Sequence, residues 1–541
     1  FGKVKYVLGK AFSSVNQEVP EKFIEQLNET FDKLINKSTE IDVEEIQDVI
    51  QNELIKRNKY DVVESFIIYR NKRAEVREQK SDLIKEIQRK LQGTNIENQN
   101  ANVDEASFGG RIGEAARIVT KNDALKYKMS KKSRKNHENN EIYIHDLDSY
   151  SAGMHNCLTM PLDKLLTNGF KTRQTDVRPA SSVGTAMQLV AVLFQLQSLQ
   201  QFGGVSASHL DWTMVPFVRK SFYKHFNDGV KYLYNHMGGD YTIGTPETPI
   251  DDKCYTNLIS LNRYAMDMTI REINQSVEGM YHNLNTLQSR SGNQLPFSSI
   301  NYGTCTLPEG RMVIKALLEK SIEGTGKFGR TSIFPCGIFQ YSKDINGKPG
   351  TPNYDLYKLA LKSTAQRLYP NYVNVDWSGN AGYDKNDPRT YMSTMGCRTV
   401  NGFDVNGLGY LKDGRGNICP VTIIMPTLAM QTGGEIGDKN IDDFIKLLDK
   451  KIGEAKDMLI ERFNFIASQD SAAARFMYDN NTMAGYVPEE GIISALKHGT
   501  LSLGQLGVAE ALQILIGCDH TTDEGMILAP GMVFTIEPMV N

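Results

Sequence analysis

The stretch "YMSTMGCRTVNG" (Tyr391–Gly402) places two sulfur-bearing side chains, Met395 and Cys397, two residues apart around a glycine. This spacing of a thioether and a thiol is typical neither of a disulfide nor of a zinc knuckle. Taken alone, Met395 is most simply a flexible core residue and Cys397 a buried thiol. A functional interpretation of the stretch therefore needs support from the rest of the chain.

The chain has 541 residues, which predicts either several domains or one large domain with an appendage. Hydrophobic residues make up 40% and charged residues 23%, as in globular proteins. The net charge of -3 gives the whole chain no attraction to nucleic acid or to a membrane. The apolar run Leu189–Phe194 is far shorter than the roughly 20 residues that a membrane span needs.

The seven cysteines are scattered and form no CxxC pair. This pattern argues against a secreted disulfide framework and against a zinc ribbon, and it favours a reducing, cytoplasmic location. The sequence also shows no secretory signal pattern. The thiols are then either buried and inert or individually reactive.

Two domains and a linker are predicted. Apolar residues recur at helical spacing in three segments, which are Glu18–Asn36, Ser38–Asn58 and Lys59–Glu78. The polar residues 86–110 are predicted to be a linker. Residues 111–525 mix helical periods with short β-like runs such as "EIYIHDL" and "VTIIMP", which predicts an α/β domain. The simplest interpretation of residues 1–85 is a small helical bundle used for packing or association.

Two polar stretches are further site candidates. The segment Tyr143–Leu158 contains His155, Asn156 and Cys157. It offers no ligand pair on one helical face, such as HExxH, so we predict no metal site. A Cys–His hydrolase and an ordinary polar loop are the alternatives for this segment. The stretch Ser291–Thr304 is rich in hydroxyls and turn residues, so we expect a loop suited to anionic or sugar-bearing ligands.

Several short motifs follow one another in an order that resembles the anaerobic, class III ribonucleotide reductases. They are "MHNCL" (154–158), "GNQLPFSS" (292–299), "SIFP" (332–335), "GTPNYDLYKLAL" (350–361), "MGCRT" (395–399), "GRGN" (414–417) and "LSLGQLGVAEAL" (501–512). Nearer the N-terminus, "VEEIQDVIQNEL" and "YDVVESFIIYRNKR" resemble the ATP-cone, a regulatory nucleotide-binding module of that family. Each motif is modest alone, but their joint order is highly specific.

The resemblance implies a ten-stranded α/β barrel with a central finger loop, preceded by a small, mainly helical ATP-cone in residues 1–85. On the loop, Cys397 matches the family's thiyl position, which removes the 3′-hydrogen of the ribose. Cys157 matches the thiol on the opposite face of the sugar, which protonates the leaving 2′-hydroxyl and donates reducing equivalents. Met395 matches a methionine of the formate-using members, and Asn417 matches an amide that orients substrate or formate. The implied reaction is the anaerobic reduction of ribonucleoside triphosphates with formate as reductant.

The resemblance also implies ligand contacts and partners. The resemblance implies that His155 and Asn156 lie beside the ribose and that Glu510 also binds substrate, with a helix-stabilising acid as the alternative for Glu510. We expect the loop with Ser298 and Ser299 to bind the triphosphate. The residues implied to bind effectors are Asp176 and Gln188 for a dNTP at a dimer interface, and Tyr69 and Arg70 for ATP or dATP in the cone. The implied partners are a second copy of the chain, or a larger nucleotide-dependent oligomer, and a radical S-adenosylmethionine iron–sulfur activase.

The chain departs from the family at both ends. The cone begins too late to include the family's nucleotide-binding strand pair. The glycyl radical loop, with its Cys-Gly-Tyr core, and the four-cysteine zinc site do not occur, since no cysteine follows Cys518. The stretch Leu528–Asn541 resembles instead a region of methionine aminopeptidases, with Glu537 as its metal-binding glutamate. We therefore expect residues 526–541 to be an atypical tail and the chain to be truncated and incomplete for turnover.

Two other functions remain as alternatives. One is another glycyl radical enzyme of the pyruvate formate-lyase type, which would carry adjacent catalytic cysteines, and the sequence has no such pair. The other is a nucleotide-binding regulatory protein with an incomplete catalytic domain. The missing radical domain keeps this second alternative open.

Overall fold

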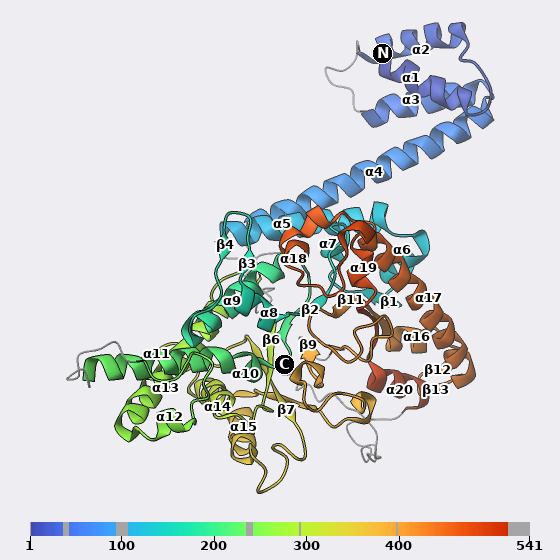
Figure 1. Cartoon of the computed structure of the whole chain (residues 1–541). Helices are drawn as coiled ribbons and strands as arrows, with labels where there is room; N and C mark the ends of the chain where they lie inside the picture. Colours follow the sequence, from blue (N-terminus) through green and yellow to red (C-terminus); the bar gives the residue numbers. More distant parts are fainter. Residues whose placement is uncertain are drawn as a thin grey trace. The chain divides into compact units, whose positions relative to one another are not determined.

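The computed structural model describes residues 2–35, 43–92, 107–233, 242–290, 294–395 and 399–517. The chain divides into two compact units, Phe1–Thr94 and Asn95–Asn541 (Figure 1). The boundary falls within residues 86–110, the range predicted to be a linker. Among the described helices, none is both long enough and apolar enough to cross a membrane.

The first unit is helical. Its helices are α1 (Gly2–Ser13), α2 (Glu21–Ile35), α3 (Val43–Lys56) and α4 (Tyr60–Gln92). A small core joins them, and its fully buried members include Phe12, Leu54 and Phe66. The helix predicted to end at Glu78 continues to Gln92 because neither glycine nor proline interrupts the sequence between Tyr60 and Gly93.

The second unit is built on a mixed sheet of eight strands in the order β1-β11-β2-β5-β6-β7-β8, with β14 paired to β11. The strands are β1 (Ile142–Ile144), β2 (Cys157–Thr159), β5 (Val205–Ala207), β6 (Ser298–Tyr302), β7 (Cys336–Tyr341), β8 (Asn371–Asn374), β11 (Gly416–Ile424) and β14 (Thr500–Leu506). The strands β2, β5, β6, β7 and β8 run parallel to one another. The pair β11–β14 is parallel within itself, and β11 is antiparallel to β2.

The α/β class is therefore as predicted, while the described residues place eight strands in this sheet where the resemblance implied ten. Among the described residues, three two-stranded ribbons lie outside this sheet. They are β3 (Phe170–Lys171) with β4 (Asp176–Val177), β9 (Thr394–Met395) with β10 (Thr399–Val400), and β12 (Gly434–Glu435) with β13 (Asp438–Lys439).

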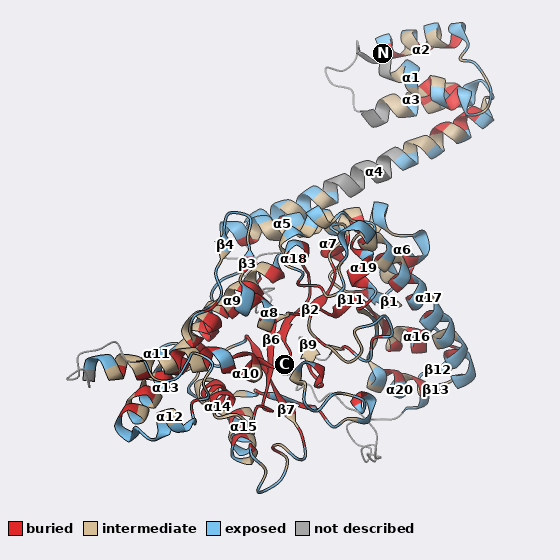
Figure 2. Cartoon of the chain, in the orientation of Figure 1, coloured by how far each residue is buried: buried red, intermediate tan, exposed pale blue. Residues whose placement is uncertain are grey.

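Helices cover the sheet, and buried residues concentrate on its strands and on the helix faces that pack against them (Figure 2). The helices before β6 are α5 (Phe108–Asp123), α6 (Lys131–Glu138), α7 (Leu147–Tyr150), α8 (Leu162–Asn168), α9 (Val183–Ser198), α10 (Leu210–Thr213), α11 (Val215–Leu233), α12 (Lys253–Thr256) and α13 (Ile259–Leu284). Those after it are α14 (Pro308–Glu323), α15 (Tyr354–Arg367), α16 (Met425–Gln431), α17 (Ile441–Ala467), α18 (Arg475–Asp479), α19 (Ile493–Leu496) and α20 (Val508–Ile516).

Two cores hold this unit together. The larger core packs α9, α11, α13 and α14 against β2, β5 and β6. The smaller core packs α16, α17 and α20 against β1 and β11. Local signals fix the helix starts: Ser182 Oγ accepts from the Thr185 amide at the start of α9, and Pro308 opens α14. The helices that connect the strands therefore pack against the sheet from outside.

Candidate active site

One side of the sheet carries polar side chains. On β5, Val205 and Ala207 belong to the larger core, and Ser206 between them points to the other side. On β6, Ile300 and Tyr302 belong to the core, and Asn301 points away from it. We call this second side the inner face, and its members are Cys157, Ser206, Ser299, Asn301, Gln340 and Asn417.

Cys157 and Asn417 lie side by side on the inner face. They are direct Cα partners in the antiparallel pair β2–β11, and opposed residues of such a pair project to the same face. Asn417 is 1% exposed, and its Nδ2 donates a hydrogen bond to Ser502 Oγ on β14. Its Oδ1 is buried without a partner among the described residues. Buried acceptors without a partner are rare in proteins. The Oδ1 of Asn417 is thus an available acceptor beside Cys157.

The ribbon β9–β10 lies on the inner face and is held through its backbone. The Thr394 amide donates to Asn301 Oδ1 at 3.1 Å, and the Thr394 carbonyl accepts from Asn301 Nδ2 and Ser206 Oγ, each at 3.0 Å. Gln340 Nε2 donates to the Met392 carbonyl at 3.0 Å. These three polar side chains are fully buried, so they depend on the ribbon for hydrogen bonds. Three neighbouring strands thus fix the position of β9.

Met395 follows Thr394 on β9 and is 2% exposed. Its Sδ lies 3.7 Å from Asn401 Nδ2. β9 lies beside β2, which carries Cys157 (Figure 1). Three of the predicted catalytic residues, Cys157, Met395 and Asn417, are therefore gathered at the inner face. The fourth, Cys397, lies between β9 and β10 in the chain and outside the described residues.

The thiol of Cys157 is held by a close backbone approach. The Gly204 amide donates to Cys157 Sγ at 3.2 Å, and the Leu158 amide donates to the Gly204 carbonyl at 3.0 Å. A Cβ on Gly203 would lie 2.0 Å from Asn156 Oδ1 and 2.7 Å from Cys157 Sγ. Only glycine can therefore occupy position 203, because any side chain would displace the thiol.

His155 and Asn156 immediately precede β2, and both are buried. His155 Nε2 lies 3.0 Å from Met477 Sδ, and Nδ1 has no partner among the described residues. Burial lowers the pKa of His155 to about 4, so the imidazole is neutral at pH 7. His155 also lines a cavity of about 140 Å³ together with Gln200 and Tyr478.

The loop expected at Ser298 and Ser299 is wrong, because both residues belong to strand β6 and are fully buried. The small, polar residues before them predicted a turn, but backbone pairing with β5 and β7 continues the parallel sheet through this point. Ser298 points to the core side with Ile300, and Ser299 points to the inner face with Asn301. Of the two, only Ser299 is oriented toward the side that carries Cys157.

The remaining predicted residues lie elsewhere. Glu510 is exposed in the first turn of α20. This helix follows β14, and the end of β14 that leads into it pairs with Ile424 of β11. Asn417 occupies the opposite end of β11, so the structure does not bring Glu510 to the inner face. Asp176 and Gln188 are both exposed.

In the first unit, Tyr69 and Arg70 are half-buried on α4. Arg70 Nη1 donates to Asp48 Oδ1 at 2.5 Å and to Gln51 Oε1 at 3.1 Å, so its guanidinium joins α4 to α3. Because Asp48 is exposed, its ion pair with Arg70 adds little to the free energy of unfolding by itself. Neither placement tests the predicted effector contacts.

A charged cluster lies near the end of β5. Among the described residues, Asp163, His209 and Asp413 bring ligand-type atoms within 4.8 Å of one another. His209 Nε2 lies 3.0 Å from Asp163 Oδ2, and Ser208 Oγ donates to Asp413 Oδ1 at 2.5 Å. Although burial disfavours the imidazolium, Asp163 and Asp413 raise the pKa of His209 to about 9. The protonated imidazole thus supplies a positive charge to the carboxylates, as in a structural ion pair.

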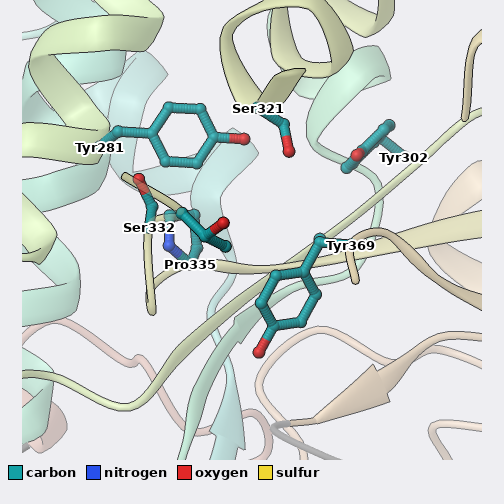
Figure 3. A pocket seen from close by; sticks show the side chains of 8 residues that line it. Tyr281, Tyr302, Ser321, Ser332, Pro335 and Tyr369 are labelled. Carbon is teal, nitrogen blue, oxygen red and sulfur yellow. The ribbon is translucent and has the colours of Figure 1, made fainter. Parts of the chain in front are cut away.

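A second, smaller cavity lies on the core side of the sheet (Figure 3). Tyr281, Tyr302, Ser321 and Tyr369 line it. Its volume of about 10 Å³ is enough for about one water molecule. Because Tyr302 points away from Asn301 on the same strand, this cavity is separate from the inner face.

Sequence reasoning missed the residues that hold the candidate site. Ser206, Asn301 and Gln340 were not predicted, although Asn301 lies in a stretch that was singled out for its polarity. The available signal was a polar residue inside an otherwise apolar run, as in "SINYG" (299–303). Such residues need a buried partner, which the sequence does not identify.

Residues 99–540 match a family model described as anaerobic ribonucleoside-triphosphate reductase, and residues 1–75 match the ATP cone domain. The first match extends to residue 540 and so includes nearly all of the tail, residues 526–541, which lies outside the described residues. The curated relative from Haemophilus influenzae, an anaerobic ribonucleoside-triphosphate reductase, is 27% identical over 91% of this chain. The relative of the same name from Enterobacteria phage T4 is 29% identical over 80% of this chain and 68% of its own length.

The chain spans 65% of the length of the Haemophilus influenzae relative. Among solved structures, one described as an anaerobic ribonucleotide reductase matches with a TM-score of 0.52 and 16% identity, covering 80% of this chain and 61% of the other. The Thermotoga maritima anaerobic ribonucleotide reductase in complex with dATP and CTP matches with a TM-score of 0.50 and 16% identity, covering 81% and 68%. At these identities the likeness supports the fold alone.

Proposed function

Because the chain belongs to the anaerobic ribonucleoside-triphosphate reductase family, we propose that it supplies the ATP-cone and catalytic barrel of an enzyme that makes 2′-deoxyribonucleoside triphosphates. One observation carries the proposal. Cys157 and Asn417 are cross-strand partners on the inner face, and β9, which carries Met395, lies beside β2. This meeting of residues from distant motifs supports the proposal.

The proposed chemistry removes a hydroxyl that does not leave readily from a neutral sugar. The family's glycyl radical supplies the oxidising centre that starts the reaction. Cys397 removes the 3′-hydrogen and later returns it, which is feasible because S–H and ribose C–H bonds have similar strengths. Cys157, on the other side of the sugar, gives a proton to the departing 2′-hydroxyl. The Gly204 amide holds its sulfur in place for that step.

Asn417 orients the reacting molecules through its free Oδ1, which can accept a hydrogen bond from a substrate hydroxyl or from protonated formate. Met395 contributes a soft, polarisable sulfur close to the strand that carries Cys157. That sulfur can share an unpaired electron with the sulfur of Cys157. Such sharing explains why the thioether is needed if formate, rather than a second thiol, is the reductant.

The native gene product, activated anaerobically, is expected to reduce CTP with formate and to release labelled carbon dioxide from labelled formate. The carbon dioxide and the dCTP should form in equal amounts, because each reduction consumes two electrons. A parallel reaction without formate provides the control. Formation of dCTP without labelled carbon dioxide would overturn formate as the reductant.

A Met395→Leu variant is expected to lose turnover by about 100-fold, because leucine fills the same volume but cannot share an unpaired electron. The measurement is the rate of dCTP formation with formate. Met392→Leu is the matched control, since Met392 lies on the same segment and packs instead with Ile338 and Val373. The role of Met395 is contradicted if both variants turn over at the wild-type rate.

Regulation and partners complete the proposal. ATP or dATP binds the cone and shifts the enzyme between active and inactive assemblies, which requires different affinities for the two states. A dNTP at a dimer interface selects the base that is reduced, with Asp176 and Gln188 as contacts. An iron–sulfur activase introduces the glycyl radical.

A further inference from the structure

The turn Phe202–Gly204 wraps the residues around Cys157. The Phe202 amide donates to the His155 carbonyl at 3.0 Å, and the Gly203 amide donates to the Asn156 carbonyl at 2.9 Å. The Gly204 amide then donates to Cys157 Sγ at 3.2 Å. The placement of the thiol therefore depends on what holds this turn.

Arg290 holds the turn from the opposite direction. Its Nε donates to the Phe202 carbonyl at 2.8 Å, and its Nη2 donates to the same oxygen. Its Nη1 donates to Gln294 Oε1 at 2.5 Å. The side chain is only 10% exposed. A buried guanidinium that places two donors on one carbonyl restrains that carbonyl strongly.

Arg290 also brings a positive charge to the turn whose Gly204 amide contacts Cys157. Its nearest acidic group is Asp146, whose Oδ1 lies 3.5 Å from Nη2 and whose side chain is 34% exposed. Burial lowers the pKa of Arg290, whereas Asp146 and Cys157 raise it, so the guanidinium and the thiol influence each other electrostatically. The other ionisable groups nearby are the neutral His155, the Arg117–Asp148 pair, and Arg462, which stacks on the Phe202 ring at 4.5 Å.

We propose that Arg290 is a positioning residue for Cys157: it fixes the Phe202–Gly204 turn so that the Gly204 amide meets the sulfur, and its buried charge stabilises the Cys157 thiolate. A thiolate beside a cation and a hydrogen-bond donor forms more readily than one in an apolar site. The inference rests on the proposed function, in which Cys157 gives up a proton to the departing 2′-hydroxyl.

The test is the pH dependence of Cys157 alkylation in the protein without nucleotide. Iodoacetamide reacts with the thiolate, and mass spectrometry of the Cys157 peptide gives the rate from about pH 6 to 10. Arg290→Gln keeps one donor but removes the charge, so the midpoint is expected to rise by about one pH unit, with about tenfold slower alkylation at pH 7. Arg290→Lys keeps the charge and is expected to restore most of the wild-type profile.

A second variant moves the profile in the opposite direction. Asp146→Asn removes the carboxylate that offsets Arg290, so the midpoint is expected to fall by about half a pH unit. Asparagine suits this position, because Asp146 has a φ of 45°, a left-handed conformation that asparagine tolerates. A merely structural role would not give shifts of opposite sign. The rate at half-buried Cys254 and the thermal unfolding midpoint report whether each variant keeps its fold.

The inference is overturned if folded Arg290→Gln titrates like the wild type, or if Asp146→Asn shifts the midpoint upward. Should Arg290→Gln fail to fold, the direction of the Asp146→Asn shift decides alone. Failure of the reductase proposal is distinguishable, because it would abolish deoxynucleotide formation and leave both alkylation shifts in place. If deoxynucleotide forms normally and the alkylation shifts do not appear, the reductase proposal stands and Arg290 has no part in it.

Discussion

A Cys157→Ser variant is expected to form no measurable deoxynucleotide, with turnover lower by roughly a thousandfold or more. Serine is nearly the same size and can still accept from the Gly204 amide, so the buried strand β2 should fold normally. Its hydroxyl, however, neither ionises readily nor gives up a hydrogen atom as a thiol does. The measurement is dCTP formation by the activated enzyme, alongside the thermal unfolding midpoint.

Cys254→Ser provides the matched control, because the same substitution is made at a half-buried thiol on α12. This variant is expected to turn over like the wild type. If Cys157→Ser also retained turnover, the second thiol would have to be sought elsewhere. Cys336 would then be the next candidate, since it lies at the start of β7 and is 8% exposed.

An Asn301→Ala variant is expected to lose about 100-fold in turnover and about 2–4 kcal/mol in the free energy of unfolding. The amide of Asn301 satisfies both the Thr394 amide and the Thr394 carbonyl, and it also donates to the Ala207 carbonyl at 2.9 Å. Removing it leaves buried backbone groups unpaired and frees β9 to move. The measurements are dCTP formation and denaturant unfolding.

Ile300→Val is the control for stability, because Ile300 lies on the same strand and faces the core. It is expected to cost about 1 kcal/mol without a loss of turnover. Similar turnover in Asn301→Ala and the wild type would mean that the position of β9 does not govern the reaction. Comparing both variants at equal fractions of folded protein separates the two effects.

The sequence singled out side chains that the structure brings close together, but it did not predict the framework that holds them. Cys157, Met395 and Asn417 were selected through short motifs, and their roles in catalysis stay a prediction. The pairing of Cys157 with Asn417 could not be predicted, because strand register between distant segments depends on packing across the whole sheet. Gly203 and Arg290 were missed for the same reason, since each acts on Cys157 only through the folded turn.

Buried polar strands explain the main error. Ser298 and Ser299 were expected in a loop because hydroxyl-rich segments next to glycine usually form turns. In the structure both residues pair with β5, and Ser299 pairs with β7 as well. The polar inner face of β5, β6 and β7 is completed by a ribbon that comes from much later in the chain. The α/β class, by contrast, followed from local periodicity alone. Local patterns therefore predicted the elements, and long-range contacts determined the site.

The docking of β9 has a consequence for how the interior can be opened. Ser206 and Asn301 bond to Thr394 of β9, and Gln340 bonds to Met392 just before it. These bonds are made inside the fold, so lifting the segment would leave donors and acceptors unpaired on three strands at once. The ribbon is therefore a cooperative part of the barrel and not a swinging flap. Small molecules that reach the inner face must therefore pass around β9 while it stays in place.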